Sequence, residues 1–343
     1  MTIELDCSMG EGGGSVVRIA VALAAGQGIN LRLFNIRANR TNPGLRAQHI
    51  EALSAIKQFS GMSSQDLRIG SSQLTLSKET DETDIAYVNI GTAGSIGLVT
   101  QAVTFYSFLQ KRNLELNING GATHGKWAPS LEYLQNITNA FARKMGKEIF
   151  ISASKYGFYP KGGAEARVII KKHDALNPLI MIERGKLEKI EIYSIVSKRL
   201  AERRVAERQI ASFLKNIKSD VDVLEKPCYV DSLSAGTGLT VVGHYSSGTR
   251  MGCFIPGERN LTSEKVGEIC ASLWKKNSNS SASIDEFAAD QLIVPMALTE
   301  EKSEITTTEI TNHTRTNIKL VQKFLNRDIT YKKEDNYYKI TVS

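Results

Sequence analysis

The sequence repeats one strand-and-helix unit, and this repeat limits the possible fold more than any other feature. The end of a strand, a polar loop and an amphipathic helix follow one another at residues 35–61, 117–146 and, in shorter form, 308–326. A small-residue turn and an apolar helix precede each copy, at residues 12–28, 92–110 and 283–300. The repeated unit therefore reads as strand, helix, strand, helix, strand.

The spacing of the copies indicates an insertion. The first two copies lie about 80 residues apart and the second and third about 190, so about 110 residues interrupt the third copy. We therefore predict an α/β (α+β) fold in which three βαβαβ-type repeats form a large domain from residues 1–183 and 280–343. Residues 184–279 form a small α/β domain inserted in the third repeat.

The insertion has its own pattern of elements. We expect strands at residues 187–197, 221–230, 239–245 and 251–255, and helices at 200–214 and 264–275. Arginine and glutamate alternate along the first helix, which is typical of a solvated surface, although a nucleic-acid face stays open as an alternative.

Composition and charge indicate a globular protein with an anionic partner. The 343 residues are 41% hydrophobic and 23% charged, which suffices for a large core. No apolar run approaches the roughly 18 residues of a membrane span, and no signal-peptide pattern opens the chain, so we expect a soluble cytoplasmic protein. The formal net charge of +7 suggests nucleic acid as a partner.

The cysteines do not indicate a metal site. Cys7, Cys228, Cys253 and Cys270 lack paired CxxC spacing, which argues against zinc and against a dense disulfide framework. Free thiols are the favoured interpretation. Cys228 and Cys253 flank strand-like segments and could meet, and whether they are bonded is left open.

The strand-to-helix loops are the candidate ligand sites, because helix N-termini present free N–H groups and a partial positive charge. In the first loop, Glu11 is followed by Gly12, Gly13 and Gly14 and then by an apolar helix that carries Arg18. The glycines let a phosphate approach the backbone, and Glu11 could hold a metal ion or a ribose. The alternative is a tight turn with a solvated carboxylate. No Gly-Lys-Ser/Thr follows, so the loop is not a Walker A motif.

The later loops add cationic, polar and aromatic side chains. The second loop contains Arg37 and Arg40, with Gln48 just beyond it, and arginine forks suit phosphate oxygens. The fourth loop holds a set that can stack on a base and contact phosphate: His124, Lys126, Trp127 and Pro129.

Two helices carry further polar candidates. The third loop is Gly91–Ser95, and Gln101 lies on the apolar helix that follows it, where it could be merely tolerated. After the fifth loop, Phe287, Asp290 and Gln291 are spaced to lie near one helical face.

The sixth loop contains His313 just ahead of a helix. The helix dipole disfavours protonation there, and a neutral imidazole can attack phosphorus. A plain capping loop is the alternative from the residues alone.

Eight blocks, in order, resemble the RNA 3′-terminal phosphate cyclases over essentially the whole chain. They are GEGGGSVVR, NIRANRTNPGLRAQH, GTAGSIGLVTQ, YGFYPKGGAE, AGTGLT, PGERN, DEFAADQLIVPMAL and TNHTRTNI. The resemblance implies a catalytic, histidine-containing member whose fold is three repeats with a small inserted domain. It also implies a three-step, ATP-dependent reaction. A histidine takes AMP from ATP, AMP passes to an RNA 3′-phosphate, and the neighbouring 2′-OH displaces AMP to leave a 2′,3′-cyclic phosphodiester.

The resemblance also implies roles for individual residues. His313 matches the nucleophile, and Glu11 a carboxylate near the metal, which would be Mg²⁺ or Mn²⁺. The ATP-binding set is Glu11, Gln101, Pro129, Phe287, Ala288, Ala289, Asp290 and Gln291, with Phe287 stacking on adenine opposite Pro129. The set near the RNA phosphate is Arg18, Arg37, Arg40 and Gln48.

Some positions depart from the family pattern, and some alternatives remain. Ser15 stands where the family often has Gln, Ala164 interrupts a glycine triplet, and Phe287 replaces a frequent Tyr, which keeps stacking but loses a hydroxyl. A ribosome-assembly relative without the histidine, an enolpyruvyl transferase and a non-catalytic basic RNA-binding module are the competing classes. The RNAs used, the role of the insertion, the preferred metal and the oligomeric state, including a homo-oligomer, are left open.

Overall fold

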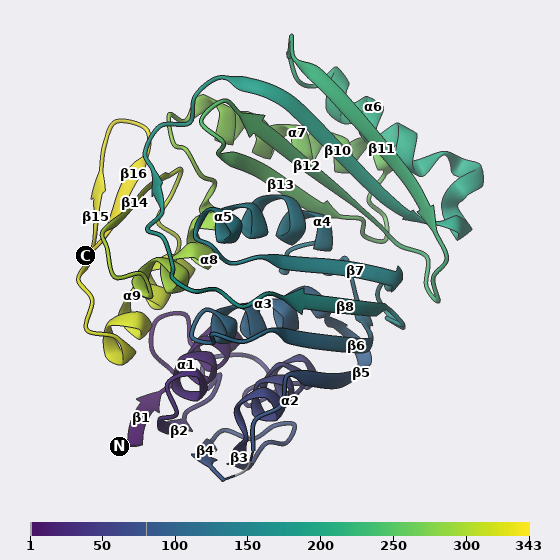
Figure 1. Cartoon of the computed structure of the whole chain (residues 1–343). Helices are drawn as coiled ribbons and strands as arrows, with labels where there is room; N and C mark the ends of the chain where they lie inside the picture. Colours follow the sequence, from purple (N-terminus) through teal and green to yellow (C-terminus); the bar gives the residue numbers. More distant parts are fainter. Residues whose placement is uncertain (1, 80) are drawn as a thin grey trace.

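A computed structural model describes residues 2–79 and 81–343 as a mixed α/β protein with four four-stranded sheets (Figure 1). Among these residues, no helix is both long and apolar enough to span a bilayer. The first sheet has the order β1-β2-β4-β3 and is built from β1 (Thr2–Asp6), β2 (Asn30–Phe34), β3 (Met62–Gln65) and β4 (Leu74–Lys78). The second has the order β5-β6-β8-β7 and is built from β5 (Ile85–Ser95), β6 (Leu114–Ala122), β7 (Ile149–Lys155) and β8 (Glu165–Ile170).

The third sheet joins parts of the chain that are far apart. It contains β9 (Ile180–Met181), β14 (Ser303–Thr307), β15 (Ile329–Lys333) and β16 (Tyr338–Val342) in the order β15-β16-β14-β9. Each of these three sheets has one parallel pair, followed by two strands that join antiparallel. Each therefore has one strand more than the predicted five-element unit, because the chain turns back after the third strand.

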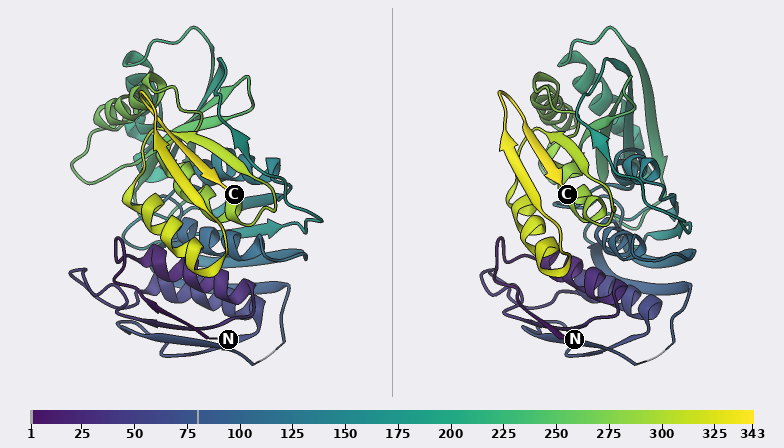
Figure 2. Two further views of the ribbon diagram at one scale, coloured as in Figure 1. Left: turned by 90° about the vertical axis from the view of Figure 1, so that its left-hand side faces the viewer. Right: turned by 60° about the vertical axis from the view of Figure 1, so that its left-hand side comes forward.

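Helices pack between these sheets. α1 (Gly14–Gly26), α2 (Ala47–Ser60) and α3 (Ile96–Ser107) contact one another, and α8 (Glu286–Ala297) contacts α3 and α9 (Asn312–Phe324). Figure 2 shows α9 lying along α1, although these helices stand near opposite ends of the chain. The apolar runs of α1, α3 and α8 are buried almost completely, which explains their nearly continuous hydrophobic sequences. One helix, formed by α4 (Leu131–Tyr133), a π-helical turn (Leu134–Thr138) and α5 (Asn139–Lys144), precedes β7.

Residues 187–279 form the fourth sheet and its helices, close to the elements expected from the sequence. The sheet order is β11-β10-β12-β13, from β10 (Leu187–Ser197), β11 (Asp222–Val230), β12 (Thr237–Tyr245) and β13 (Arg250–Pro256). A 3-10 turn (Lys198–Arg203) and α6 (Val205–Lys215) replace the single helix expected at 200–214, and α7 (Ser263–Asn279) follows β13. This sheet and its two helices enclose a separate apolar cluster that includes Ile192, Phe213 and Trp274.

The four cysteines are free, as the sequence favoured, and the contact between Cys228 and Cys253 that the sequence left open does not form. Cys253 lies on the buried face of β13, and its Sγ is 3.1 Å from Sγ of Cys270 on α7. Cys228 is exposed on β11.

Candidate active site

The glycine-rich turn after β1 brings the backbone close to a side chain of α2. Gly10 and Gly12 have φ of +58° and +56°, which glycine adopts without strain. A methyl group at Gly14 would overlap the imidazole of His49 on α2. With any larger residue at position 14, the His49 imidazole or the turn would have to shift.

Glu11 and His313 meet at this turn, although they are far apart in the sequence. Oε2 of Glu11 lies 2.9 Å from Nδ1 of His313, next to the N-terminus of α9. Partial burial lowers the pKa of His313, the Glu11 charge opposes that shift, and Arg18 and Arg40 add to it. A carboxylate can only accept, so Nδ1 carries the proton and the lone pair of Nε2 is left free.

The start of α9 is held in place by Asp290 of α8. Thr311 caps α9 and donates from Oγ1 to Oδ1 of Asp290 at 2.6 Å, and Thr314 donates to the same oxygen. Asn317 donates to the Asp290 carbonyl at 2.8 Å. Burial raises the pKa of Asp290 to about 7 despite these bonds. Asp290 thus positions the helix that carries His313.

Arginines surround the other side of the turn. Arg18 is 6% exposed, no acidic side chain pairs with it among residues 2–79 and 81–343, and burial lowers its pKa to about 10. A buried guanidinium in this state is suited to an anionic ligand. Arg40 lies nearer the surface, with Nη2 3.4 Å from the Glu11 carbonyl and 3.9 Å from Oε2 of Glu11.

Arg37 and Gln48 take different places. Arg37 donates from Nη1 to the carbonyls of Asn42 and Gly44, at 2.7 and 3.0 Å. One nitrogen of its guanidinium group therefore stabilises the loop that contains Arg37. Gln48 lies against the third loop, where a methyl group at Gly94 would be 3.3 Å from Cβ of Gln48.

Of the residues expected to bind ATP, some lie at a cavity or at the surface and others are buried in the core. Gln101 and Gln291 line one small cavity between α3, α8 and the helix of residues 131–144. Phe287 is 48% exposed at the start of α8, whereas Ala288 and Ala289 are buried in the core. The carbonyl of Pro129 lies against Gly97 near the start of α3.

The segment after Pro129 is tied to the start of α8. Tyr133 donates to Oδ1 of Asp285 at 2.5 Å, and Asp285 caps α8 just ahead of Phe287. This bond connects the elements that carry Pro129 and Phe287.

The fourth loop does not offer the full set of contacts that its sequence suggests. His124 is buried, with Nε2 2.9 Å from Oε2 of Glu132, and packs against aromatic rings. Lys126 pairs with Glu258 at 2.8 Å. Trp127, which is 88% exposed, is the one of these three that remains open to a ligand.

The structure adds one residue that the sequence reasoning missed, His49. Burial, together with Arg18, Arg37 and Arg46, lowers the pKa of His49 to about 3. The imidazole is therefore neutral, and Nδ1 accepts from the Arg46 backbone N–H at 3.0 Å. Its position next to Gln48, in the first turn of α2 and directly after a loop rich in arginine, was the available signal.

Comparison with known proteins identifies the family. A family model described as RNA 3′-terminal phosphate cyclase matches residues 9–331. The chain belongs to the RNA 3′-terminal phosphate cyclase family.

Individual relatives match along almost their whole length. The chain is 34% identical over 340 residues to the RNA 3′-terminal phosphate cyclase of Methanococcoides burtonii, covering 99% of each protein. It is 33% identical over 333 residues to that of Archaeoglobus fulgidus, covering 96% of this chain and 97% of the relative. It is 35% identical over 330 residues to that of Pyrococcus abyssi, with 95% and 94% covered. These matches confirm the family resemblance of the eight blocks.

A metal in this ATP-dependent family would need ligands from the nucleotide. Within residues 2–79 and 81–343, no three or more His, Cys, Asp or Glu side chains gather as a metal site. Mg²⁺ is usually held by one or two carboxylates together with substrate phosphates. The Glu11 carboxylate beside the glycine turn fits that donor set.

Proposed function

We propose that the chain converts an RNA 3′-terminal phosphate to a 2′,3′-cyclic phosphodiester at the cost of ATP, with His313 as the nucleophile. The contact between Glu11 and His313 carries this proposal. It holds the proton on Nδ1 and directs the nucleophilic lone pair to Nε2.

In the first step, Nε2 of His313 attacks the α-phosphorus of ATP. The nitrogen–phosphorus bond forms as the bond from the α-phosphorus to the bridging oxygen breaks, and pyrophosphate leaves. Positive charge develops on the imidazole, and the Glu11 carboxylate stabilises it. Mg²⁺ or Mn²⁺, bound through Glu11 and the phosphates, would offset charge on the triphosphate.

In the second step, an oxygen of the RNA 3′-phosphate attacks the histidine-bound phosphorus, and the bond to Nε2 breaks. In the third, the ribose 2′-hydroxyl oxygen bonds to the 3′-phosphorus, its proton is lost to solvent, and AMP leaves. Arg18 and Arg40 face the glycine turn as cations for the terminal phosphate, and Arg37 holds the loop of Arg40. Gln48 lies at the neighbouring third loop.

We place the nucleotide between the starts of α3 and α8. Phe287 would stack on adenine opposite Pro129, and Gln101 and Gln291 would lie beneath it. Asp290 acts through α9, while Ala288 and Ala289 support the pocket from the core. The exposed ring of Phe287 supports this placement.

We also propose that the three sheets of like order are three copies of one unit, and that residues 184–279 are a domain inserted into the third copy. Shared strand order and pairing support this division. RNA with a 3′-phosphate end is the partner, in the cytoplasm, and a homo-oligomer is compatible with this assignment.

The test is incubation of the protein with ATP labelled on the α-phosphate, with Mg²⁺ or Mn²⁺, followed by denaturing separation. We expect an acid-labile, alkali-stable label on the native protein and on a His244→Ala control, and none on His313→Ala. Label that survives in His313→Ala would remove the nucleophile assignment. No label on the native protein with either metal would favour a non-catalytic RNA-binding protein.

A further inference from the structure

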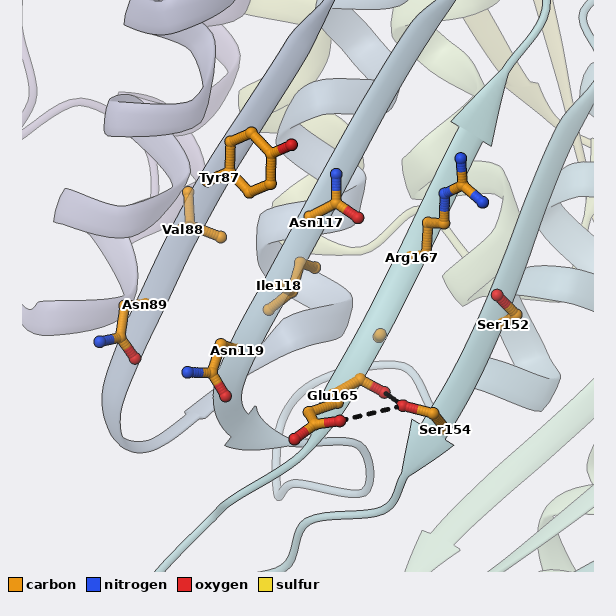
Figure 3. A pocket seen from close by; sticks show the side chains of 11 residues that line it. Tyr87, Val88, Asn89, Asn117, Ile118, Asn119, Ser152, Ser154, Glu165 and Arg167 are labelled. Atoms are coloured by element: carbon orange, nitrogen blue, oxygen red, sulfur yellow. Dashed lines mark hydrogen bonds between the residues drawn. The ribbon is translucent and has the colours of Figure 1, made fainter.

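The outer face of the second sheet forms an open groove that the proposed reaction does not use. The groove has a volume of about 560 Å³ and is lined from all four strands (Figure 3). Its polar and aromatic lining includes Tyr87, Asn89, Asn117, Asn119, Ser152 and Arg167. The helices α2, α3 and α5 contact these strands, and their buried side chains lie on the opposite, core-facing side.

Strand register arranges the groove side chains in rows. One row crosses all four strands through Tyr87, Asn117, Arg167 and Ser152. The next row runs through Asn89, Asn119 and Glu165, and the Glu165 carboxylate is paired with Lys155 at 2.5 Å. Figure 3 shows these side chains on neighbouring strands of the same sheet. A ligand lying across the strands would therefore meet one aromatic ring and several carboxamides.

The chemistry of this face suits bases and riboses better than free phosphates. Tyr87 is 67% exposed, and in the described part of the chain the side chains of Asn89, Asn119 and Ser152 make no hydrogen bond. Carboxamides both donate and accept, as base edges and ribose hydroxyls require. Arg167 is paired with Glu115 at 2.5 Å, so the charge of this row is balanced.

Both edges of the sheet are occupied by glutamine side chains. Gln58 accepts from the Tyr87 N–H at 3.0 Å and donates to the Tyr87 carbonyl at 2.9 Å. On the opposite edge, Gln135 accepts from the Ile151 N–H at 2.9 Å. An added strand would have to displace these bonds, so the open face, rather than an edge, is the surface for a partner.

The groove leads towards the candidate active site. β5 continues from Asn89 to Gly94, which packs against Gln48, and Ser95 then caps α3. Five residues of strand span about 17 Å. A chain whose end lies at the second loop, residues 37–44, here called the arginine loop, can therefore continue into the groove.

We propose that this groove binds the single-stranded RNA segment immediately upstream of the 3′-phosphate. Tyr87 stacks on a base, and Asn89, Asn117 and Asn119 bond to base edges and ribose hydroxyls. The direction of the RNA rests on the proposed function, which places the 3′-phosphate at the arginine loop. Because the cations on this face are paired, binding there depends only weakly on salt.

The test measures the affinity of a fluorescent 3′-phosphorylated dodecanucleotide for the full chain without ATP. Stacking on one base accounts for about a fivefold to hundredfold change in affinity, and we expect Tyr87→Ala to weaken binding within that range. Tyr87→Phe keeps the ring and should bind as the native protein does. Asn119→Asp should also weaken binding, because it places a negative charge beside the RNA. Thr330→Asp, which adds the same charge to the exposed strand β15, is the matched control and should not.

Two further measurements separate this proposal from the proposed function. A 3′-phosphorylated dinucleotide is too short to reach Tyr87, so its affinity should not change in Tyr87→Ala, and self-adenylylation without RNA should stay at the native rate. Equal dodecanucleotide affinities for the native protein and Tyr87→Ala would overturn the groove proposal even in an active cyclase. Groove-dependent RNA binding by a protein that never forms an AMP adduct would support the groove and sink the proposed reaction. A change in oligomeric state of Tyr87→Ala, with RNA affinity unchanged, would assign the face to a second copy of the chain and overturn the RNA assignment.

Discussion

Replacing Glu11 with glutamine tests whether its carboxylate positions and stabilises the nucleophile. Oε2 of Glu11 lies 2.9 Å from Nδ1 of His313, and glutamine keeps the side-chain length but removes the charge. The imidazole gains positive charge as Nε2 bonds to phosphorus, so the loss falls mainly on the transition state.

The magnitude follows from the kind of hydrogen bond that is lost. A bond to a charged group contributes about 1.5–3 kcal/mol, and a neutral one about 0.5–1.5 kcal/mol. The difference of about 1–2 kcal/mol corresponds to adenylylation slowed about fivefold to thirtyfold. The half-exposed His313 side chain favours the lower part of that range.

The same substitution should move the pH dependence. The Glu11 charge raises the pKa of His313 against burial and the nearby Arg18 and Arg40. Removing that charge lowers the pKa of His313 further, so the imidazole stays unprotonated to lower pH. The acid limb of the adenylylation rate therefore shifts to lower pH in Glu11→Gln.

The assay is the initial rate of labelling by α-labelled ATP between about pH 5 and pH 8, where an imidazole titrates. Glu225→Gln, an exposed residue of β11, is the matched control and should behave as the native protein does. An unchanged rate with an unmoved acid limb would refute the reasoning. A slower rate that excess Mn²⁺ restores, again with an unmoved acid limb, would assign Glu11 to the metal alone.

Three further substitutions test neighbouring residues. Arg40→Ala should slow cyclisation of 3′-phosphate RNA about tenfold more than self-adenylylation, since a charge-assisted hydrogen bond to the RNA phosphate is lost; equal losses in the two rates would contradict a role on the RNA side. Gly14→Ala should lower the unfolding free energy in urea by about 1–3 kcal/mol, because the new methyl group overlaps His49; native stability would show that His49 moves aside freely. Asp290→Asn should flatten the dependence of the unfolding free energy on pH. Burial raises the pKa of Asp290 from 3.8 to about 7, so between these pH values the folded state holds a proton that the unfolded state has released. The contribution of Asp290 to native stability therefore falls as the pH rises from 3.8 to about 7. Parallel stability curves for the native protein and Asp290→Asn would count against that shift.

Local pattern was enough to predict most elements of residues 187–279. The apolar and β-branched runs of β10 and β12 and the amphipathic pattern of α7 can be recognised from consecutive residues. The strands β3 and β4 are only four and five residues long, and so short a segment is weak evidence for a strand even where Leu74 and Leu76 alternate with polar residues. The predicted unit therefore lacked the fourth strand of the first sheet.

The candidate site was partly predictable for a different reason. A glycine run and a histidine at a helix start are local signals, and they drew attention to Glu11 and His313, whose side chains lie in contact in the structure. Which side chains meet across the fold is not a local property. The burial of His124 against Glu132 and the packing of His49 on Gly14 depend on tertiary contacts between separate elements.

The third sheet imposes an order of assembly on the nascent chain. β9 leaves the growing chain before the fourth sheet and α8, yet its parallel partner is β14, with Ile180 opposite Glu304. The strands of the first two sheets are synthesised one after another, so those sheets can form during translation. β9 has no partner strand until roughly a hundred or more further residues have been synthesised, and pairing it with β14 closes a long loop at a cost in chain entropy. Limited proteolysis of ribosome-bound chains ending after β13 should find the second sheet protected and β9 open. Synthesis of residues 187–279 therefore postpones completion of the third sheet. The helix that carries His313, α9, is among the last parts of the molecule to fold.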